Sequence, residues 1–232
     1  MKQNEFGAFI LSETKNGERI VSCGGRISTR QGTAVEIYKK SIDKTKNLNL
    51  ISKVISSGHT TILEHHYFNI AFNNVSVFVE QFLIEFRLAS FTIKSGRYVN
   101  FSKSGFNLSD EFSDEQKTVL SRHYRDMLRT YDELVQKGVP IEDARFVLPN
   151  ACCTKIVCTF NARSLDNFFA HRCCNRAQWE IQSVAEQMLK LCLEVAPNLF
   201  KRCGPPCLNG ACPEGKMTCG KQKEVRERYG KG

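Results

Sequence analysis

The sequence has no long apolar run. None of its apolar stretches reaches the ~18 residues that a membrane-spanning helix requires. The opening residues Met1-Lys2-Gln3-Asn4-Glu5 lack the apolar segment of a signal peptide. We therefore expect no membrane span and no export signal, and we expect a cytoplasmic location. Hydrophobic residues still make up 41% of the 232 residues, which is enough to bury the core of one ordinary globular domain.

The sequence also lacks the motifs of several large enzyme classes. It has no G-x-S-x-G nucleophile elbow, no phosphate-binding loop of the form G-x-x-x-x-G-K-[S/T] and no G-x-G-x-x-G dinucleotide motif. It shows no internal repeat and no low-complexity segment. These absences favour a protein whose own groups bind ligands while a cofactor carries the difficult chemistry.

Acidic residues are outnumbered: 24 Asp and Glu stand against 33 Lys and Arg, which gives a net charge of +9. Such an excess attracts nucleic acids, nucleotides, dinucleotides and folyl polyglutamates alike. The basic residues are scattered and are not interleaved with aromatic residues as in a base-stacking surface, so nucleic-acid binding is not favoured.

A small-residue turn flanked by cations stands at Ser95-Gly96-Arg97. A serine offers a hydroxyl group, a glycine lets the backbone approach an anion closely, and an arginine can donate two parallel hydrogen bonds to phosphate oxygens. The turn therefore predicts a phosphate-binding site. The alternative is a helix that ends in a solvated glycine turn.

Eleven cysteines are present, and we expect them to be reduced thiols because no export signal accompanies them. Those in apolar or helical surroundings are expected to be buried as small hydrophobic side chains: Cys152, Cys153, Cys158, Cys173 and Cys174.

The C-terminal segment differs because its thiols lie among glycines and prolines. Its pattern is Cys203-x3-Cys207-x4-Cys212-x6-Cys219. Four thiols can bind a tetrahedral Zn²⁺, and the alternative is a flexible tail. We therefore divide the chain into a domain at residues 1–200 and a Cys-rich basic tail at 201–232.

The apolar periodicity predicts an α+β fold, with a small, mostly antiparallel sheet and helices packed around it. Short apolar runs at 9–11 and 20–22 indicate an opening strand or two, and further strands are predicted at 67–72 and 156–160. The predicted helices are two within 34–56, broken by polar residues at 44–47, and single ones at 75–90, 110–137 and 162–196.

Four segments, in order, resemble the signatures of the flavin-dependent thymidylate synthases. They are Ser57-Gly58-His59-Thr60-Thr61-Ile62-Leu63-Glu64-His65 followed by Phe68, Arg87 to Tyr98, Glu142-Asp143-Ala144-Arg145-Phe146-Val147-Leu148-Pro149, and Asn161-Ala162-Arg163-Ser164-Leu165 continuing through Asn167 and Arg172 to Ala177-Gln178-Trp179-Glu180-Ile181. Agreement in order and spacing over roughly residues 57–182 carries more weight than any single short motif.

The resemblance implies reductive methylation of dUMP, or of a related pyrimidine nucleotide, by a homotetramer. Methylenetetrahydrofolate would supply the carbon, and FAD reduced by NADPH would supply the hydride. It implies catalytic roles for Arg145 and Arg172, which would polarise the pyrimidine. The implied nucleotide-binding residues are Ser95, Gly96, Arg97, Arg145, Arg172 and Gln81, and the implied flavin-binding residues are His59, Thr61, Arg87, Asn161, Arg163 and Asn167.

The chain departs from the family pattern R-H-R-x-x-S-x-N-x-x-S-x-R-Y at three positions. Glu85 and Phe86 stand where the family has Arg and His, and Thr92 stands where it has Asn. Glu85 reverses a charge and Phe86 removes a hydrogen-bond donor. Altered folate use, action on another pyrimidine nucleotide, and a nucleotide-binding flavoprotein without methyl transfer therefore stay open.

Overall fold

The computed structural model describes residues 6–230, and their contacts form two compact units. The first unit contains the described residues up to Ala8 with Ala71–Arg87 and Phe91–Cys158, and the second contains Phe9–Ile70, Leu88–Ser90 and the described residues from Thr159 onward.

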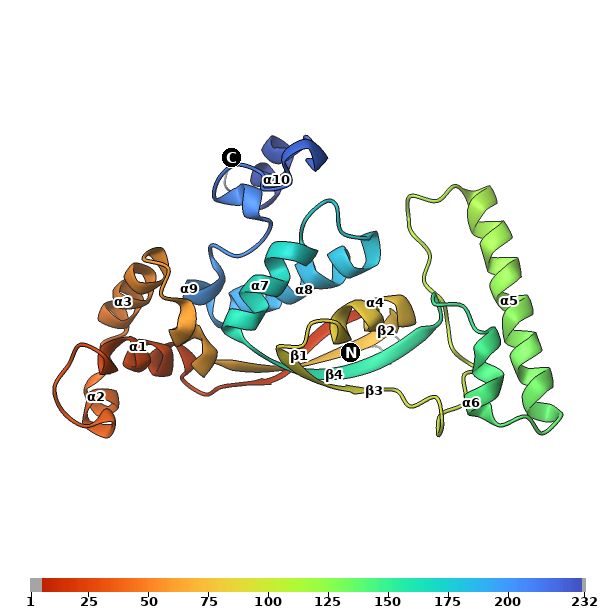
Figure 1. Cartoon of the computed structure of the whole chain (residues 1–232), viewed down its shortest axis with the longest axis horizontal. Coiled ribbons are helices and arrows are strands. Elements are labelled where there is room, and N and C mark those ends of the chain that lie inside the picture. Colours follow the sequence, from red (N-terminus) through yellow and green to blue (C-terminus); the bar gives the residue numbers. More distant parts are fainter. Residues whose placement is uncertain (1–5, 231–232) are drawn as a thin grey trace. The chain divides into compact units, whose positions relative to one another are not determined.

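A four-stranded antiparallel sheet has the strand order β1-β2-β4-β3. Its strands are β1 (Gly7–Glu13), β2 (Tyr67–Ser76), β3 (Ala89–Ile93) and β4 (Cys153–Asn161) (Figure 1). On β2, Phe68, Ile70 and Phe72 are fully buried, because alternate side chains of a strand face the same side of the sheet. The predicted α+β class is confirmed, and both predicted internal strands are present and longer than expected.

The N-terminal helices of the second unit are α1 (Gly17–Ile27), α2 (Ala34–Lys40) and α3 (Lys44–Ser56), and a 3₁₀ helix, η1 (Thr60–His65), follows them. Thr33 and Glu36 form a capping box that begins α2, and the side chain of Asp43 caps α3. The predicted helix pair is confirmed, but the break between the helices lies at 41–43, because Asp43 caps α3 and residues 44–47 form its first turn. The predicted strand at 20–22 is wrong, because these residues lie in α1. An apolar run of three residues is too short to distinguish the periodicity of a helix from that of a strand.

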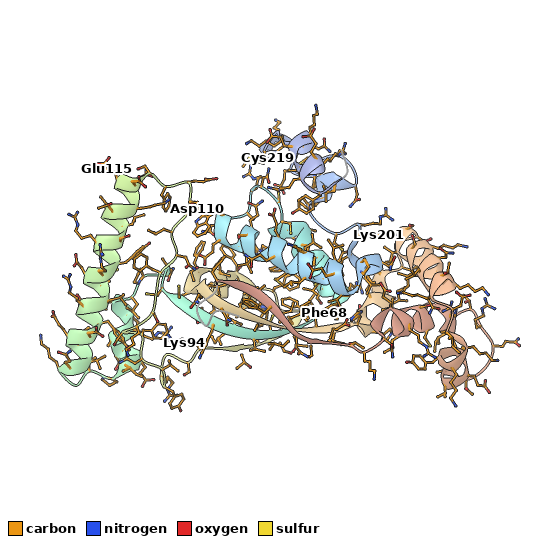
Figure 2. The ribbon with its side chains drawn as sticks, turned by 180° about the vertical axis from the view of Figure 1, so that it is seen from behind. Phe68, Lys94, Asp110, Glu115, Lys201 and Cys219 are labelled. Carbon is orange, nitrogen blue, oxygen red and sulfur yellow. The ribbon has the colours of Figure 1, made fainter. Side chains whose placement is uncertain are left out.

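The core of the second unit is built from α7 (Ala162–Arg172), α8 (Trp179–Val195) and α9 (Pro197–Phe200). Phe68, labelled in Figure 2, packs edge-to-face on Phe200 with ring centroids 5.5 Å apart. The single helix predicted at 162–196 is wrong. The chain breaks at 173–178, where the side chain of Gln178 accepts hydrogen bonds from the first backbone N–H groups of α8.

The first unit contains α4 (Val77–Ile84), α5 (Asp114–Gln136), α6 (Ile141–Ala144) and the 3₁₀ helix η2 (Arg145–Val147). The helix predicted at 110–137 is confirmed as α5, which packs against α6 (Figure 1). The helix predicted at 75–90 ends at Ile84, because the segment from Ala89 pairs with the sheet as β3, and the strand pairing overrides the local helix preference.

The Cys-rich tail forms η3 (Pro206–Leu208), η4 (Gly215–Met217) and α10 (Gln222–Arg228) around a small core of Cys207, Leu208 and Val225. Within residues 6–230, no helix combines the length and the hydropathy that crossing a bilayer requires. The domain boundary at 200/201 stays a prediction.

Candidate functional site

The predicted phosphate turn lies directly after β3 in the first unit. The hydroxyl oxygen of Ser95 accepts a hydrogen bond from the backbone N–H of Arg97 at 3.3 Å, which closes the turn locally. Lys94 is directed elsewhere: its ammonium group lies 3.5 Å from the centroid of the Phe101 ring and donates a hydrogen bond to Ser104. Arg97 is therefore the cation that the turn itself presents.

Gly96 is buried because the side chain of Arg145 lies against it. A Cβ atom at position 96 would come 2.0 Å from Nη1 of Arg145, which is far inside van der Waals contact. The structure thus brings together two residues 49 positions apart in the sequence, both of which were predicted to bind the nucleotide. Any side chain at position 96 would displace the guanidinium group of Arg145 from this place.

A cavity of about 460 Å³, the turn cavity, opens beside this contact. It brings three of the predicted nucleotide-binding residues to one place, Gln81, Arg97 and Arg145. The rest of the wall is largely apolar and consists of Val77, Phe101, Phe146, Leu148, Pro149 and Cys152. Two polar residues to which the sequence gave no role, Glu142 and Asn150, complete it. Cations and apolar surface together suit a phosphorylated compound with a flat ring.

Two carboxylates interact with the arginines of the turn cavity: Glu142 with Arg97, and Glu80 with Arg145. Glu142 forms an ion pair with Arg97, with Oε2 2.8 Å from Nε. Its contact with Nε leaves the terminal nitrogens of the guanidinium group for an anion. Glu80 on α4 is half-buried, and burial raises its pKa, an effect that its interaction with Thr154 and, to a smaller extent, the charge of Arg145 oppose. No local sequence signal connects Glu142 with Arg97, because the two residues are 45 positions apart.

Replacing Arg97 with alanine is expected to weaken nucleotide binding by about 1.5–3 kcal/mol, the range for a hydrogen bond to a charged group. The fold should survive, because 69% of this side chain is exposed. Calorimetry with dUMP measures the loss, and circular dichroism checks the fold. Unchanged affinity in a folded variant would show that the turn is only structural.

The second unit contains a cavity of about 610 Å³, the Asn161 cavity, which gathers Asn161, Arg163 and Asn167 from the predicted flavin-binding set. Its other lining residues are Thr60, Glu64, Leu88, Ser164, Asp166 and Ala170. Most of the polar side chains come from the start of α7, which begins where β4 ends, and Thr60 and Glu64 come from η1. This wall is polar, with two amides, one arginine and two carboxylates, and its amides and arginine can donate hydrogen bonds to a cofactor.

The local structure fixes two of these side chains. The side-chain oxygen of Asn161 accepts a hydrogen bond from the backbone N–H of Ser164 at 2.8 Å and so caps α7. Arg163 forms an ion pair with Glu64, and each side chain is about half exposed. Glu64 therefore orients Arg163 along the cavity wall.

The other predicted site residues lie outside these two cavities. His59 and Thr61 are exposed at the start of η1, on either side of the cavity residue Thr60. Arg87 lies in the first unit, between α4 and β3, and Arg172 ends α7 in the second unit. Their predicted roles stay predictions.

The tail thiols are not arranged as the zinc hypothesis expects. Cys203 is buried, and its sulfur lies 3.7 Å from the carbonyl oxygen of Leu199, away from the small tail core. Cys207 and Cys212 belong to that core, and Cys219 is exposed. Burial raises the pKa of the Cys207 thiol. In the described part of the chain, no three Cys, His, Asp or Glu side chains are placed to hold a metal ion, so the zinc hypothesis gains no support.

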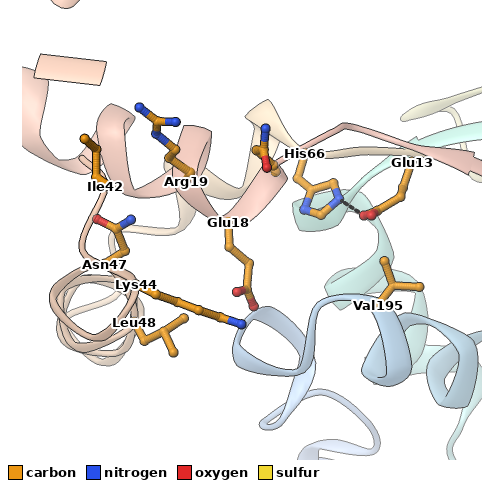
Figure 3. Close-up of a pocket in the computed structure, with 11 residues that line it drawn as sticks. Glu13, Glu18, Arg19, Ile42, Lys44, Asn47, Leu48, His66 and Val195 are labelled. Carbon is orange, nitrogen blue, oxygen red and sulfur yellow. Dashed lines mark hydrogen bonds and ion pairs between the residues drawn. The ribbon is translucent and has the colours of Figure 1, made fainter. Parts of the chain in front are cut away.

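A further cavity of about 380 Å³ in the second unit has a buried histidine, His66, in its wall (Figure 3). Nε2 of His66 lies 2.6 Å from the Glu13 carboxylate, and the ring packs against Gly17 at the start of α1. Burial lowers the pKa of His66, and the hydrogen bond and charge of Glu13 oppose this effect. This pair was not foreseen from the sequence, because its members are 53 residues apart.

Comparison with known proteins decides the family. A family model described as thymidylate synthase complementing protein matches residues 9–198. The chain is 38% identical to the flavin-dependent thymidylate synthase of Geobacter sulfurreducens, over 95% of this chain and 96% of that protein. The chain belongs to this family. It is likewise 40% identical to the Nitratidesulfovibrio vulgaris enzyme over 78% of each chain, and 36% identical to that of Sulfolobus acidocaldarius over 86% of this chain and 77% of that protein.

The predicted family membership is therefore confirmed, and the chain is an enzyme of the flavin-dependent class. The three departures from the family signature occupy different surroundings. Glu85 is the exposed C-cap of α4, Phe86 is partly buried, and Thr92 is exposed on β3. None of the three lines the turn cavity or the Asn161 cavity.

Proposed function

We propose that this enzyme converts dUMP to dTMP by reductive methylation, with methylenetetrahydrofolate as carbon donor and with FAD and NADPH as the reductant system. The observation that carries the proposal is the packing of the Arg145 guanidinium group on Gly96, inside one cavity with Arg97 and Gln81. This arrangement offers a cation for a phosphate and a second cation for a ring within the reach of one nucleotide.

Different residues at the turn cavity would bind different parts of the nucleotide. Arg97 and the turn at Ser95 and Gly96 would bind the phosphate, whose two negative charges match the guanidinium fork. Arg145 would donate hydrogen bonds to the pyrimidine carbonyl oxygens and stabilise the negative charge that develops when C5 becomes nucleophilic. Gln81 would contribute a neutral amide that can both donate and accept a hydrogen bond.

The Asn161 cavity offers the flavin hydrogen-bond partners, because two amides and an arginine positioned by Glu64 line it together with the carboxylate of Asp166. Asn161, Arg163 and Asn167 would hold the cofactor, with His59, Thr61 and Arg87 as further contacts. The flavin, when bound, supplies the hydride that turns the transferred methylene group into a methyl group. Arg172 is proposed as a second cation on the pyrimidine. The homotetramer and the cytoplasmic location belong to the same proposal.

Two measurements test the function. The purified protein is expected to bind FAD and to lose its yellow absorbance with NADPH under anaerobic conditions. A bacterial strain without thymidylate synthase is expected to grow without thymidine when it carries this gene, and an Arg145→Ala variant is the matched negative control. Soluble, flavin-loaded protein that does not support growth would reject dTMP formation and point to the changes at Glu85 and Phe86.

A further inference from the structure

The N-terminal helices and the loops that join them carry a large share of the positive charge of the chain. Residues 15–53 hold nine lysines and arginines against three acidic residues, so this segment supplies two thirds of the net charge of +9. The residues concerned are Lys15, Arg19, Arg26, Arg30, Lys39, Lys40, Lys44, Lys46 and Lys53, and Glu18, Glu36 and Asp43. A field of this kind within a single unit attracts anions.

Part of this charge lines a cavity of about 540 Å³ formed by α1, α2 and α3, the basic cavity. Four cations contribute to its wall: Arg26, Arg30, Lys40 and Lys46. The only acidic residue in that wall, Asp43, is already occupied, because it caps α3 through the backbone N–H of Lys46 at 3.0 Å and pairs with the Lys46 ammonium group at 3.4 Å. The remaining cations lack a counter-charge in the wall.

Buried neutral groups hold one of these cations in position. Nη1 of Arg26 donates hydrogen bonds to Ser22, to Oδ1 of Asn47 at 2.8 Å and to Oγ of Ser41 at 3.3 Å. The three acceptor residues are at most 4% exposed. They orient the guanidinium group without neutralising it, and in the described part of the chain its Nε and Nη2 atoms make no hydrogen bond. A charged group fixed in this way is prepared to bind an anion.

Two further cations of the cavity wall, Arg30 and Lys40, are available for a ligand. The Arg30 guanidinium group has no ion-pair partner within residues 6–230. Lys40 lies within electrostatic range of Glu36, but that carboxylate already accepts a hydrogen bond from the backbone of Thr33 at 3.0 Å in the capping box of α2. The side chains of Arg30 and Lys40 are both exposed. Their removal should therefore change ligand binding and leave the fold intact.

We propose that the basic cavity is a second phosphate-binding site, separate from the turn at Ser95–Arg97. Its ligand is either the 2′-phosphate that distinguishes NADPH from NADH, an identification that rests on the proposed function, or a free phosphate-type anion. The packing of the N-terminal helices near the Asn161 cavity, where the flavin is proposed to bind, supports the 2′-phosphate of NADPH as the ligand. The 3₁₀ helix η1 packs against α1, and its residues Thr60 and Glu64 line the Asn161 cavity in the same unit.

Calorimetry with inorganic pyrophosphate tests the site independently of activity. The double variant Arg30→Ala/Lys40→Ala is compared with Lys39→Ala/Lys53→Ala, which removes two positive charges from the same helices outside the cavity wall. We expect about tenfold weaker pyrophosphate binding in the first variant, because each lost charged contact has a substantial cost, and less than about a twofold change in the second. Dichroism confirms that both are folded.

Steady-state kinetics with NADPH and NADH separate the two sources. If the 2′-phosphate is the ligand, Arg30→Ala/Lys40→Ala raises the KM for NADPH and leaves the KM for NADH and for dUMP unchanged. Loss of pyrophosphate binding with an unchanged KM for NADPH supports the site with a free anion as its ligand. Equal losses in the two double variants, no loss in either, or a loss confined to Arg97→Ala would overturn the proposal. Pyrophosphate binding in a protein that forms no dTMP rejects only the proposed function.

Discussion

Replacing Gly96 with alanine is expected to reduce the affinity for dUMP roughly 10- to 100-fold, which corresponds to the loss of about 1.5–3 kcal/mol of charged hydrogen bonding. The added methyl group would lie 2.0 Å from Nη1 and 2.8 Å from Cδ of Arg145. An arginine side chain can swing away, so the clash moves the guanidinium group and costs little stability. The change therefore acts on the ligand contact of Arg145 through a residue that has no side chain of its own.

The matched control for this experiment is Gly105→Ala in the same unit. A Cβ atom at position 105 would lie 3.6 Å from the Cys153 sulfur, an ordinary van der Waals distance. Thermal unfolding and calorimetry with dUMP are measured for both variants. A Gly96→Ala protein that keeps full dUMP affinity would contradict the assignment of Arg145 to the nucleotide. A large loss of stability would instead show that position 96 is needed for folding.

The second large effect is expected at Asn161, which combines a structural and a ligand role. Its side-chain oxygen caps α7, while its amide N–H group remains for a ligand in the Asn161 cavity. Asn161→Ala should lower stability by about 1 kcal/mol through the lost cap, and Asn161→Ser should keep the cap and most of the stability. Both variants should bind FAD about tenfold or more weakly, because both lack the amide.

Titration of the apoprotein with FAD and thermal unfolding of the flavin-free protein distinguish the two roles. Ser113→Ala is the control, because it removes the N-cap of α5 outside the Asn161 cavity. It should lower stability and leave FAD affinity unchanged. If Asn161→Ser bound FAD as tightly as the unmodified protein, Asn161 would be a helix cap only, and the flavin assignment of this cavity would rest on Arg163 and Asn167.

Local pattern predicted those elements whose signals lie within a few residues. The helix pair at 34–56 has its caps Thr33 and Asp43 in the adjoining sequence, and α5 has both an apolar stripe and the capping box at Ser113. One error arose where a distant segment decided the structure. The segment from Ala89 is a strand because it pairs in the sheet, and an apolar run alone does not distinguish a buried helix from a strand.

The sequence by itself determined the family and the residue types of the two candidate cavities, because four ordered motifs carry that information without any knowledge of contacts. Only the tertiary structure decided the relationships between residues. It placed Arg145 on Gly96, paired Arg97 with Glu142, and left the basic cavity without a free carboxylate in its wall. The reason is physical: contact and charge compensation depend on distances in space, and residues far apart in the chain reach those distances only after the backbone has folded.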